Sequence, residues 1–333
     1  MRRHNNLFEK IVSIENLTLA AAKAKKGKRW QDTIKNFERN EELNIQKLNE
    51  SLIEKTFTTS KYKIKKVYEP KEREIYVLPF YPDRIVQHAI MNVIEPIWDK
   101  LFIENSYACR VGKGQHKGST KCMEFVRRNK YCLKCDIKKF YPSVKHDILF
   151  EIIKRKIKCK DTLELLKDII YSIEDGKNVP IGNYTSQWFG NLYLNELDTY
   201  IKHELKIKDY ARYSDDFILF SNCKSKLKYC KDRIETFLSD KLGLIFSKSA
   251  VFPVSHGVDY LGYRHFKKYI LLRKSTAKRV QRRISKLPKQ LEKGVIDREQ
   301  FVSSIQSTNG WLRWANTHNL KINLKIQELL EAI

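Results

Sequence analysis

The sequence has no apolar run long enough to cross a membrane and no recognisable leader peptide. No stretch reaches the ~18 consecutive apolar residues of a spanning helix. Glu9, Lys10 and Glu15 interrupt the N-terminal segment, which therefore lacks the continuous apolar region of a secretory signal. We expect a soluble cytoplasmic protein that does not use a membrane as a partner.

Neither the seven cysteines nor the eight histidines form a recognisable metal or disulfide pattern. An odd number of scattered cysteines is typical of reduced thiols in a cytoplasm. Cys132 and Cys135 have the spacing of a zinc pair, but no second pair follows, so we expect both to pack inside a strand. VGKGQHKGST has Lys-Gly-Ser where a phosphate loop needs Gly-Lys-Ser, which excludes nucleotide hydrolysis there. We expect its His116 to lie in a loop.

Acidic residues are scarce relative to basic ones. The 333 residues include 65 Lys and Arg but only 39 Asp and Glu, which gives a formal net charge of +26 at pH 7. Such a charge predicts a polyanionic partner. At roughly 150 residues per domain, the length predicts about two domains, and a hydrophobic fraction of 42% excludes disorder of the whole chain.

Hydrophobic spacing predicts helices at the N-terminus and a mixed region after them. Short aromatic or β-branched runs bounded by polar residues predict strands, and long Leu- and Ile-rich segments predict helices between them. The expected elements are helices over 7–17 and 37–52, a strand pair within 62–80, a helix over 82–97, strands at 131–137 and 210–220, and helices over 147–172 and 186–205. Strands separated by long helices predict an α+β fold.

Composition also divides the chain into three parts. We predict an N-terminal helical extension over 1–61, a mixed α/β region over 62–266 and a basic helical region over 267–333. The segment Lys267–Lys289 contains ten Lys or Arg residues and no acid. Near the N-terminus, the basic stretch LAAAKAKKGK is expected to be a loop that contacts phosphate.

The basic segment predicts an amphipathic helix with a cap at Ser275. Three apolar residues fall on one helical face and four basic residues largely on another; these are Val280, Ile284 and Leu287, and Arg279, Arg282, Arg283 and Lys286. One face can dock on the protein while the other follows phosphates, and the alternative is a solvated charged helix. Trp311 and Trp314 share a helix face, for which we expect core packing rather than base stacking.

Two adjacent acids provide the strongest local signal. Asp215 and Asp216 lie between apolar runs in YARYSDDFILF, where a tight hairpin places both near its tip. Neighbouring strand residues point to opposite faces, so the two carboxylates have different roles. Ordinary turn chemistry is the alternative interpretation of Ser-Asp-Asp.

A third acid favours a catalytic interpretation. Asp136 follows the strand-like run YCLKC, and neighbouring strands lie only ~4.8 Å apart. Three carboxylates at one sheet edge can bind two divalent ions, which in polymerases activate a hydroxyl and stabilise the leaving oxygen in phosphoryl transfer. Mg²⁺ suits a site made of few carboxylates and substrate phosphates, and Mn²⁺ is an alternative.

Ordered motifs along the chain resemble those of reverse transcriptases. They are CDIKKFYPSV, IGNYTSQWFGNLYLNELD, RYSDDFILF, LGLIFSKS and VDYLGY. The IGNYTSQ form is similar to that of diversity-generating retroelement reverse transcriptases, as are REIYVLPFYPDRIVQHAI, YACRVGKGQHKG, LLRKSTAKR and WANTHNL. The resemblance covers about residues 29–320 and implies a right-hand polymerase, with fingers and palm over 62–266 and a thumb over 267–333.

The resemblance also implies roles for individual residues. Asp136, Asp215 and the backbone carbonyl of Ile137 are expected to bind metal, with Asp216 as the second acid of its pair. Tyr141 is expected to exclude a 2′-hydroxyl and so favour dNTPs, unless its ring only packs beneath a strand end. Other implied dNTP contacts are Lys71, Arg73 and Lys248, and the implied template or primer contacts are Arg110, Gln187, Leu261, Gly262 and Tyr263.

Solvent-exposed alternatives apply to the basic members of these sets. Lys71 and Arg73 can belong to a solvated hairpin, and Arg110 to a surface ion pair. Lys248 matches its motif only loosely.

Ile181 occupies a position where most reverse transcriptases have a glutamine that contacts the incoming nucleotide. An aliphatic side chain cannot donate a hydrogen bond there. We therefore predict low fidelity, and the resemblance implies misincorporation opposite template adenines.

The predicted function is RNA-directed DNA synthesis by a diversity-generating retroelement in a bacterial host. The implied partners are template RNA, a cDNA or RNA primer, dNTPs and an accessory variability determinant protein, which forms a pentamer in relatives. Two alternatives stay open: another prokaryotic reverse transcriptase, of a retron, group II intron or antiphage system, or an RNA-binding protein that keeps the fold without catalysis.

Overall fold

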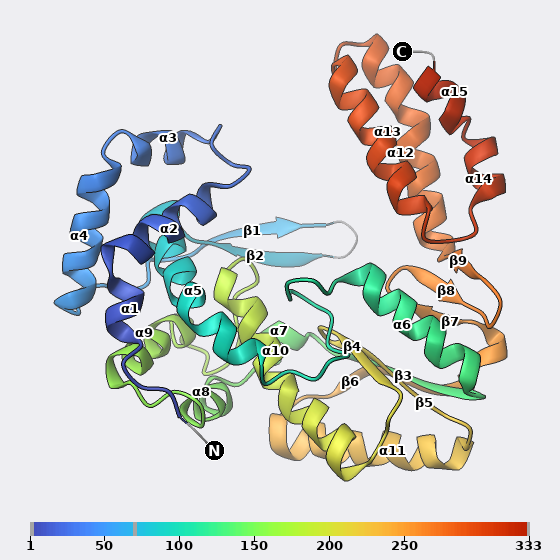
Figure 1. Ribbon diagram of the computed structural model, residues 1–333, viewed down its shortest axis with the longest axis horizontal. Coiled ribbons are helices and arrows are strands. Elements are labelled where there is room, and N and C mark those ends of the chain that lie inside the picture. Colours follow the sequence, from blue (N-terminus) through green and yellow to red (C-terminus); the bar gives the residue numbers. More distant parts are fainter. Residues whose placement is uncertain (1–2, 69–71, 332–333) are drawn as a thin grey trace. The chain divides into compact units, whose positions relative to one another are not determined.

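A computed structural model describes residues 3–68 and 72–331 (Figure 1). Contacts within the chain divide it into two compact units, to which non-contiguous segments contribute. Unit 1 consists of the residues up to Glu104, Asp136–Lys206 and Asp232–Lys248. Unit 2 consists of Asn105–Cys135, Ile207–Lys231 and the residues from Ser249 onward. The three-part division made from the sequence rests on motifs and composition, and it stays a prediction.

Unit 1 begins with four short helices rather than two long ones. They are α1 (Phe8–Val12), α2 (Ile14–Lys25), α3 (Asp32–Glu38) and α4 (Glu41–Ile53). The first predicted helix is interrupted because Ser13 is extended, and its hydroxyl accepts a hydrogen bond from the backbone N–H of Asn16, which caps α2. Asn16 also donates its side-chain amide to the carbonyl of Ala89, which holds α2 against a later helix.

The predicted basic loop after Leu19 is wrong over most of its length. Helix α2 continues to Lys25, because alanine favours helix, and Ala20, Ala21 and Ala24 of LAAAKAK are buried. Lys25 is buried and pairs with Glu38 and Glu41. It is therefore a structural cation and is not available to phosphate.

A two-stranded sheet and a long helix follow, as predicted. Strands β1 (Lys63–Val67) and β2 (Arg73–Val77) are antiparallel, with Val67 opposite Arg73. Helix α5 (Ile85–Asp99) continues from a π-helical turn over Phe80–Arg84, in which only Tyr81 has non-helical angles. Helical backbone therefore starts at Pro82, as predicted, and Tyr81 is extended because a residue before proline avoids helical angles.

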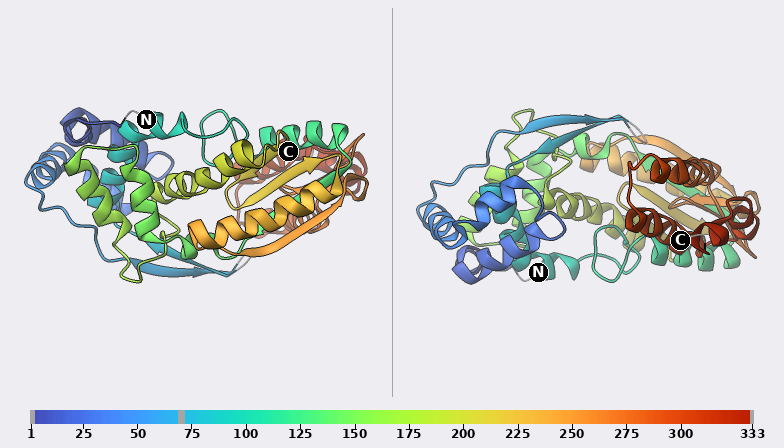
Figure 2. Two further views of the ribbon diagram at one scale, coloured as in Figure 1. Left: turned by 90° about the horizontal axis from the view of Figure 1, so that it is seen from below. Right: turned by 90° about the horizontal axis from the view of Figure 1, so that it is seen from above.

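The remaining helices of unit 1 follow α5 in the chain. The predicted helix over 147–172 consists of two, whereas the one predicted from Ser186 is a single helix that ends in a π-helical turn. The bounds are α7 (Phe140–Ser143), α8 (His146–Lys154), α9 (Lys160–Ile170) and α10 (Tyr184–Thr199), with π-helical turns at Tyr200–Glu204 and Leu238–Leu242. Helices α5 and α10 lie side by side in both Figure 1 and Figure 2 and contact each other.

Unit 2 contains a four-stranded sheet in the order β4-β5-β3-β6. The strands are β3 (Tyr131–Ile137), β4 (Tyr210–Tyr213), β5 (Asp216–Ser221) and β6 (Phe246–Pro253), and the last residues of β3 and the first of β6 belong to unit 1. Helix α11 (Lys224–Phe237) follows β5. The predicted strands at 131–137 and 210–220 are confirmed, and a turn divides the second into β4 and β5.

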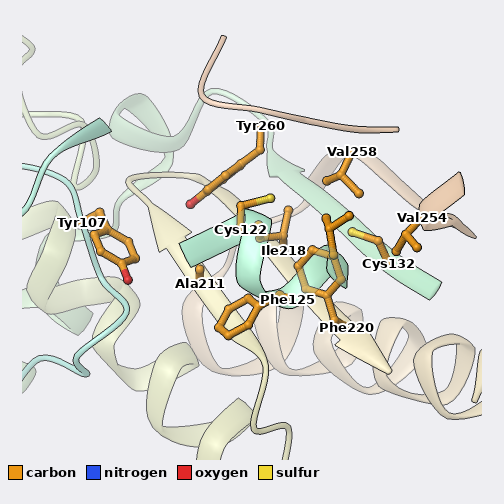
Figure 3. Close-up of a cluster of buried hydrophobic side chains, with 11 residues drawn as sticks. Tyr107, Cys122, Phe125, Cys132, Ala211, Ile218, Phe220, Val254, Val258 and Tyr260 are labelled. Carbon is orange, nitrogen blue, oxygen red and sulfur yellow. The ribbon is translucent and has the colours of Figure 1, made fainter. Parts of the chain in front are cut away.

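Helix α6 (Gln115–Arg128) covers one face of this sheet. Cys122 and Phe125 of the helix face Cys132, Ile218 and Phe220 of the strands (Figure 3). Cys132 and Cys135 are both fully buried, which confirms their predicted packing role. His116 lies in the first turn of α6, so its predicted loop position is wrong.

A second sheet and four helices complete unit 2. Strands β7 (Val258–Tyr260), β8 (Tyr263–His265) and β9 (Ile270–Leu272) are antiparallel, and a short 3₁₀ turn over Val254–His256 precedes them. The helices are α12 (Lys274–Glu292), α13 (Arg298–Leu312), α14 (His318–Asn323) and α15 (Ile326–Glu331). None of the helices in the described ranges is both long and apolar enough to span a lipid bilayer.

These four helices enclose a small core of their own. The apolar face predicted for the basic segment is confirmed: Val280, Ile284 and Leu287 of α12 pack with Phe301 and Ile305 of α13. Helices α12 and α13, drawn in orange to red, lie side by side in Figures 1 and 2. The predicted Ser275 cap is wrong, because the N-cap is Arg273 and no side chain caps the helix.

The two tryptophans of this region have different environments, although the sequence predicts core packing for both. Trp311 packs against the core and stacks on Tyr263 with ring centroids 5.1 Å apart. Trp314 remains 45% exposed and stacks on His116 at 4.3 Å. Core packing is therefore correct for Trp311 and wrong for Trp314.

Candidate active site

Asp136, the first of the predicted metal ligands, lies in unit 1 at the penultimate position of β3. Its side chain is partly buried, and Oδ2 accepts a short hydrogen bond from the hydroxyl of Ser247 on β6. The same hydroxyl lies 3.2 Å from the backbone carbonyl of Asp136. Ser247 therefore orients this carboxylate, a contact that sequence reasoning missed. Its only signal was its place in the LIFSKS motif.

Tyr141 follows Asp136 on the short helix α7, after a left-handed turn at Lys139 with φ of 44°. Its ring is partly buried and packs against Gly190 of α10. A Cβ atom at position 190 would lie 3.1 Å from both the Tyr141 and the Phe140 rings. Gly190 therefore lets both rings approach α10 closely. This contact fixes the aromatic that the sequence predicts as the sugar gate.

Ile181 lies beside the β1-β2 hairpin. Its backbone carbonyl accepts a hydrogen bond of 2.7 Å from the backbone N–H of Tyr76 on β2. The next residue, Gly182, has φ of 129°, and a Cβ atom there would lie only 2.2 Å from the Tyr76 carbonyl oxygen. Only glycine fits this approach. The strand that carries Arg73 is thereby held directly against the IGNYTSQ motif.

Further hydrogen bonds brace this junction. Asn183 is buried and donates its side-chain amide to the Tyr62 hydroxyl at 2.8 Å. Asn178 donates to the hydroxyl of Tyr76 at 3.1 Å. The position of Ile181 is therefore set by contacts from several segments of unit 1, while Arg73 itself is exposed at the start of β2.

The predicted acid pair lies in unit 2, at the β4-β5 hairpin. Tyr213 and Asp216 are directly opposite each other, so the turn consists of Ser214 and Asp215. Ser214 has φ of 55°, which suits a tight hairpin turn. The predicted hairpin is therefore confirmed, with Asp215 in the turn and Asp216 as the first residue of β5.

A fully buried arginine lies beneath this turn. Arg212 is 0% exposed, and its guanidinium donates a hydrogen bond of 3.3 Å to the carbonyl of Ser214. Its backbone also pairs with the segment before α6, through Asn105 and Tyr107. Arg212 thus anchors the turn that presents Asp215. Sequence reasoning missed this role, since YARY was interpreted only as an apolar strand.

Asp216 contacts a lysine from the neighbouring strand. The Nζ atom of Lys134 lies 3.5 Å from Oδ2 of Asp216 and 3.8 Å from Oδ1 of Asp259 on β7. Asp259 is also paired with Arg273, the N-cap of α12. Burial, assisted by the Asp216 charge, raises the pKa of the adjacent Tyr260 well above its usual value, so its phenol stays neutral. Neither Lys134 nor Asp259 was identified from the sequence.

The predicted template and primer residues lie on different elements. Leu261 and Gly262 form the β7-β8 turn, both with positive φ, and Tyr263 begins β8 fully buried. Gln115 of α6 donates to the Leu261 carbonyl at 2.8 Å. Arg110 donates to the Ser106 carbonyl at 3.0 Å, so its side chain is anchored to the backbone.

Other predicted positions are exposed. Gln187 is an exposed residue of the mostly buried helix α10, and Lys248 is exposed on β6 beside Ser247. On α12, Arg279, Arg282, Arg283 and Lys286 are all exposed. Lys71 lies outside the described residues. The roles assigned to these positions stay predictions.

The predicted ligands are of the kind that a hard divalent cation prefers. Within residues 3–68 and 72–331, no group of three or more His, Cys, Asp or Glu side chains is arranged to hold an ion. Mg²⁺ is typically bound by one or two carboxylates together with substrate phosphates. Asp136 and the Asp215-Asp216 pair supply oxygen donors of this kind, each within its own unit.

Comparisons with known proteins identify the family. The family model described as reverse transcriptase (RNA-dependent DNA polymerase) matches residues 63–265. Protein YkfC of Escherichia coli K12 is 26% identical over 279 residues, which cover 68% of this chain and 71% of YkfC. The Retron Ec73 reverse transcriptase of E. coli is 30% identical over 162 residues, 45% of this chain and 49% of that protein.

Further similarities are more distant. The group II intron-encoded protein LtrA of Lactococcus lactis is 21% identical, covering 56% of this chain and 43% of LtrA. The chain thus spans about half of the retron protein and less of LtrA. Among solved structures, apo telomerase from Candida tropicalis gives a TM-score of 0.49 at 15% identity, covering 68% of this chain and 59% of that one. The matched segment contains Asp136, Asp215 and Asp216, and the chain belongs to the reverse transcriptase family, as an RNA-directed DNA polymerase of the prokaryotic type with retron and group II intron homologues.

Proposed function

We propose that this reverse transcriptase serves a diversity-generating retroelement. In this function it copies a template RNA into cDNA with frequent errors opposite adenines, and the cDNA replaces a target sequence by mutagenic retrohoming. The proposal rests on the IGNYTSQ motif, which resembles the form found in that group, and on Ile181 within it. The structural support is the junction between this motif and strand β2.

The proposed reaction joins a primer 3′-hydroxyl to the α-phosphate of a dNTP and releases pyrophosphate. Asp136, the carbonyl of Ile137, Asp215 and Asp216 would hold Mg²⁺ ions, which when bound lower the charge on the phosphates and activate the hydroxyl. Ser247 and Arg212 keep the acidic residues in place. Tyr141, fixed against Gly190, excludes a 2′-hydroxyl, and Arg73 pairs with phosphate oxygens through its planar guanidinium.

Ile181 carries the proposal of low fidelity. Its backbone carbonyl accepts the hydrogen bond from Tyr76, and Gly182 lets β2 approach too closely for any larger residue at 182. The backbone of Ile181 is therefore held against β2, while its side chain is aliphatic. An apolar side chain can fill space beside a base pair, but it cannot hydrogen-bond to it and so reject a wrong geometry.

The test is to replace Ile181 with a residue that can hydrogen-bond. Purified Ile181→Gln and Ile181→Asn proteins copy a defined RNA with all four dNTPs, and the products are sequenced. We expect fewer errors opposite adenine than with the wild type, with smaller changes opposite other bases. Ile64→Gln is the matched control, because Ile64 is 56% exposed on β1. Unchanged error rates opposite adenine in both Ile181 variants would remove this residue from the proposal.

A second candidate is a retron-like, intron-like or antiphage reverse transcriptase. The retron-like alternative is favoured by the 30% identity to the Retron Ec73 enzyme, which holds within the shared segment of 162 residues. Sequencing the DNA next to the gene separates the possibilities. A near-repeat that differs mainly at adenines supports the retroelement, whereas a structured non-coding RNA gene without such a repeat supports a retron.

A non-catalytic RNA-binding role is tested by removing the acids. Asp215→Ala and Asp216→Ala should abolish dNTP incorporation while RNA binding persists, because the basic surface is unchanged. Incorporation at the wild-type rate in both variants would exclude the proposed site.

A retroelement role also implies partners and ions beyond the RNA and dNTPs. We propose an accessory variability determinant protein, pentameric in relatives, and activity in the bacterial cytoplasm with Mg²⁺ or Mn²⁺. Co-purification of a small basic protein encoded beside this gene tests the accessory partner. Metal-dependent dNTP incorporation tests the requirement for Mg²⁺ or Mn²⁺.

A further inference from the structure

A chain of alternating charges runs through unit 2 from the catalytic hairpin to the start of α12. It begins at Asp216 on β5, continues to Lys134 on β3 and Asp259 on β7, and ends at Arg273, the residue just before α12. The backbone of Arg273 also donates to the carbonyl of Gly262 at 2.9 Å, which ties the same residue to the β7-β8 turn.

Lys134 lies at the centre of this chain and is shared by two carboxylates. Its Nζ atom lies 3.5 Å from Asp216 and 3.8 Å from Asp259, and it also donates a short hydrogen bond to the backbone carbonyl of Asp259. The side chains of Lys134 and Asp216 are only 25% and 24% exposed, so solvent screens their interaction only in part. Lys134 is therefore oriented by three oxygen atoms rather than free to rotate.

Asp259 in turn is held from its other side. Arg273 donates to Oδ1 of Asp259 through Nε at 2.8 Å and through a short bond from a terminal nitrogen. Both bonds end on the same oxygen and are charge-assisted, so they fix Oδ1 of Asp259 beside the guanidinium. The position of Lys134 beside Asp216 is thus coupled to the residue that precedes the basic helix.

We propose that Lys134 is a positioning residue for Asp216. Asp259 weakens the interaction between Lys134 and Asp216. Lys134 competes with divalent cations for the Asp216 carboxylate, and so holds that carboxylate in one orientation until substrate phosphates bring the metal. Asp259 draws part of the lysine charge away from Asp216. This inference rests on the proposed catalytic role of Asp216.

The proposal predicts opposite effects for two neutralising substitutions. Lys134→Met removes the competing cation, so the free protein should bind a divalent ion about three-fold more tightly, the size typical of a partly exposed ion pair. Asp259→Asn removes the second carboxylate, so Lys134 keeps Asp216 as its charged partner beside the backbone carbonyl of residue 259, and binding should weaken by about the same factor. General loosening of the fold would instead change binding in the same direction in both variants.

The experiment measures Mn²⁺ binding to the full-length protein by electron paramagnetic resonance, without nucleic acid, together with kcat for dNTP incorporation. Lys134→Arg should bind Mn²⁺ nearly as the wild type does, because the charge is kept. The matched control is Lys121→Met, since Lys121 forms a surface pair with Glu124 in the same unit. We expect kcat to fall in Lys134→Met despite the tighter binding, because Asp216 loses its fixed orientation.

Changes of opposite sign in the Mn²⁺ affinity of Lys134→Met and Asp259→Asn support the proposal. Changes of the same sign, or no change, overturn it. If Lys134→Met does not fold, Asp259→Asn decides alone: weaker binding supports the proposal, and equal or tighter binding overturns it. If the Asp216→Asn variant binds Mn²⁺ as tightly as the wild type does, the proposed metal role of Asp216 fails, and the inference about Lys134 fails with it.

Discussion

The orientation of Asp136 depends on a hydroxyl group 111 residues later in the chain. Ser247 donates to the carboxylate and also contacts the Asp136 backbone, so it restrains both the side chain and the strand end. A carboxylate that is already oriented loses less entropy when it binds a cation. Ser247 therefore belongs to the candidate site although it has no charge.

Replacing Ser247 tests this dependence. Ser247→Ala should lower kcat for dNTP incorporation about three- to tenfold, which corresponds to the loss of one hydrogen bond of ~1 kcal/mol. The measurement is single-turnover incorporation at saturating dNTP. Ser249→Ala, two residues further along β6, should change the rate little. Equal losses in the two variants would attribute the effect to the strand rather than to the hydroxyl.

Individual residues also show what the sequence could not reveal. The acids were found because they interrupt apolar runs, a signal that is local to each motif. The partners of these acids were missed because their contacts join separate segments: Ser247 meets Asp136 across 111 residues, and Lys134 meets Asp216 from another strand. The sequence alone does not show whether a lysine in a strand faces solvent or a partly buried carboxylate. Only the pairing of strands decides between the two.

At the scale of elements, periodic patterns predicted the presence of helices and strands better than their boundaries. Strand β3 has the predicted bounds because YCLKCDI is short, aromatic and bounded by polar residues. The helices over 7–17 and 147–172 are each divided in the structure. Ser13 explains the first division, since its hydroxyl caps a new helix and an extended residue is needed for that. Apolar spacing continues across such a break and hides it.

Helix α12 presents its basic residues outward, which supports a phosphate-binding role. Arg279, Arg282, Arg283 and Lys286 are exposed while the opposite face packs in the core. Changing these four to Gln should weaken binding of a primer–template duplex and lower the slope of log K against log salt by up to about 0.9 for each phosphate that is no longer neutralised. The measurement is fluorescence anisotropy at several salt concentrations.

The control for this change removes the same amount of charge elsewhere. Four exposed lysines of unit 1 are changed to Gln: Lys10, Lys35, Lys47 and Lys160. A smaller change of slope in this control supports phosphate binding by α12. Equal slopes in the two variants would mean that only the net charge matters.

For the whole molecule, one buried histidine in unit 2 links stability to pH. His265 is 0% exposed, and its two ring nitrogens lie 2.8 Å from the Ser119 hydroxyl and 3.0 Å from the Val258 carbonyl. Burial lowers the pKa of His265 to about 4, so the ring stays neutral in the folded protein. An unfolded chain takes up this proton near pH 6.5.

The free energy of unfolding should therefore fall as the pH drops from about 6.5 toward 4, because the unfolded state binds the proton first. The contribution of His265 is about 3 kcal/mol at most. Denaturant titrations between pH 4 and 8 measure the slope. His265→Gln should flatten it, whereas His256→Gln, at an exposed position, should not. A slope that is unchanged in His265→Gln contradicts the prediction.

The seven cysteines, none of them in a disulfide, have a practical consequence for chemical labelling. Five are buried, and only Cys109 and Cys223 are exposed, both in unit 2. A hydrogen bond from Ser225 lowers the pKa of Cys223, whereas burial of its sulfur raises the pKa of Cys109. Because the thiolate is the reactive form, maleimide should modify Cys223 first. Native protein thus offers one preferred attachment point for a fluorophore, next to α11, without any engineered cysteine.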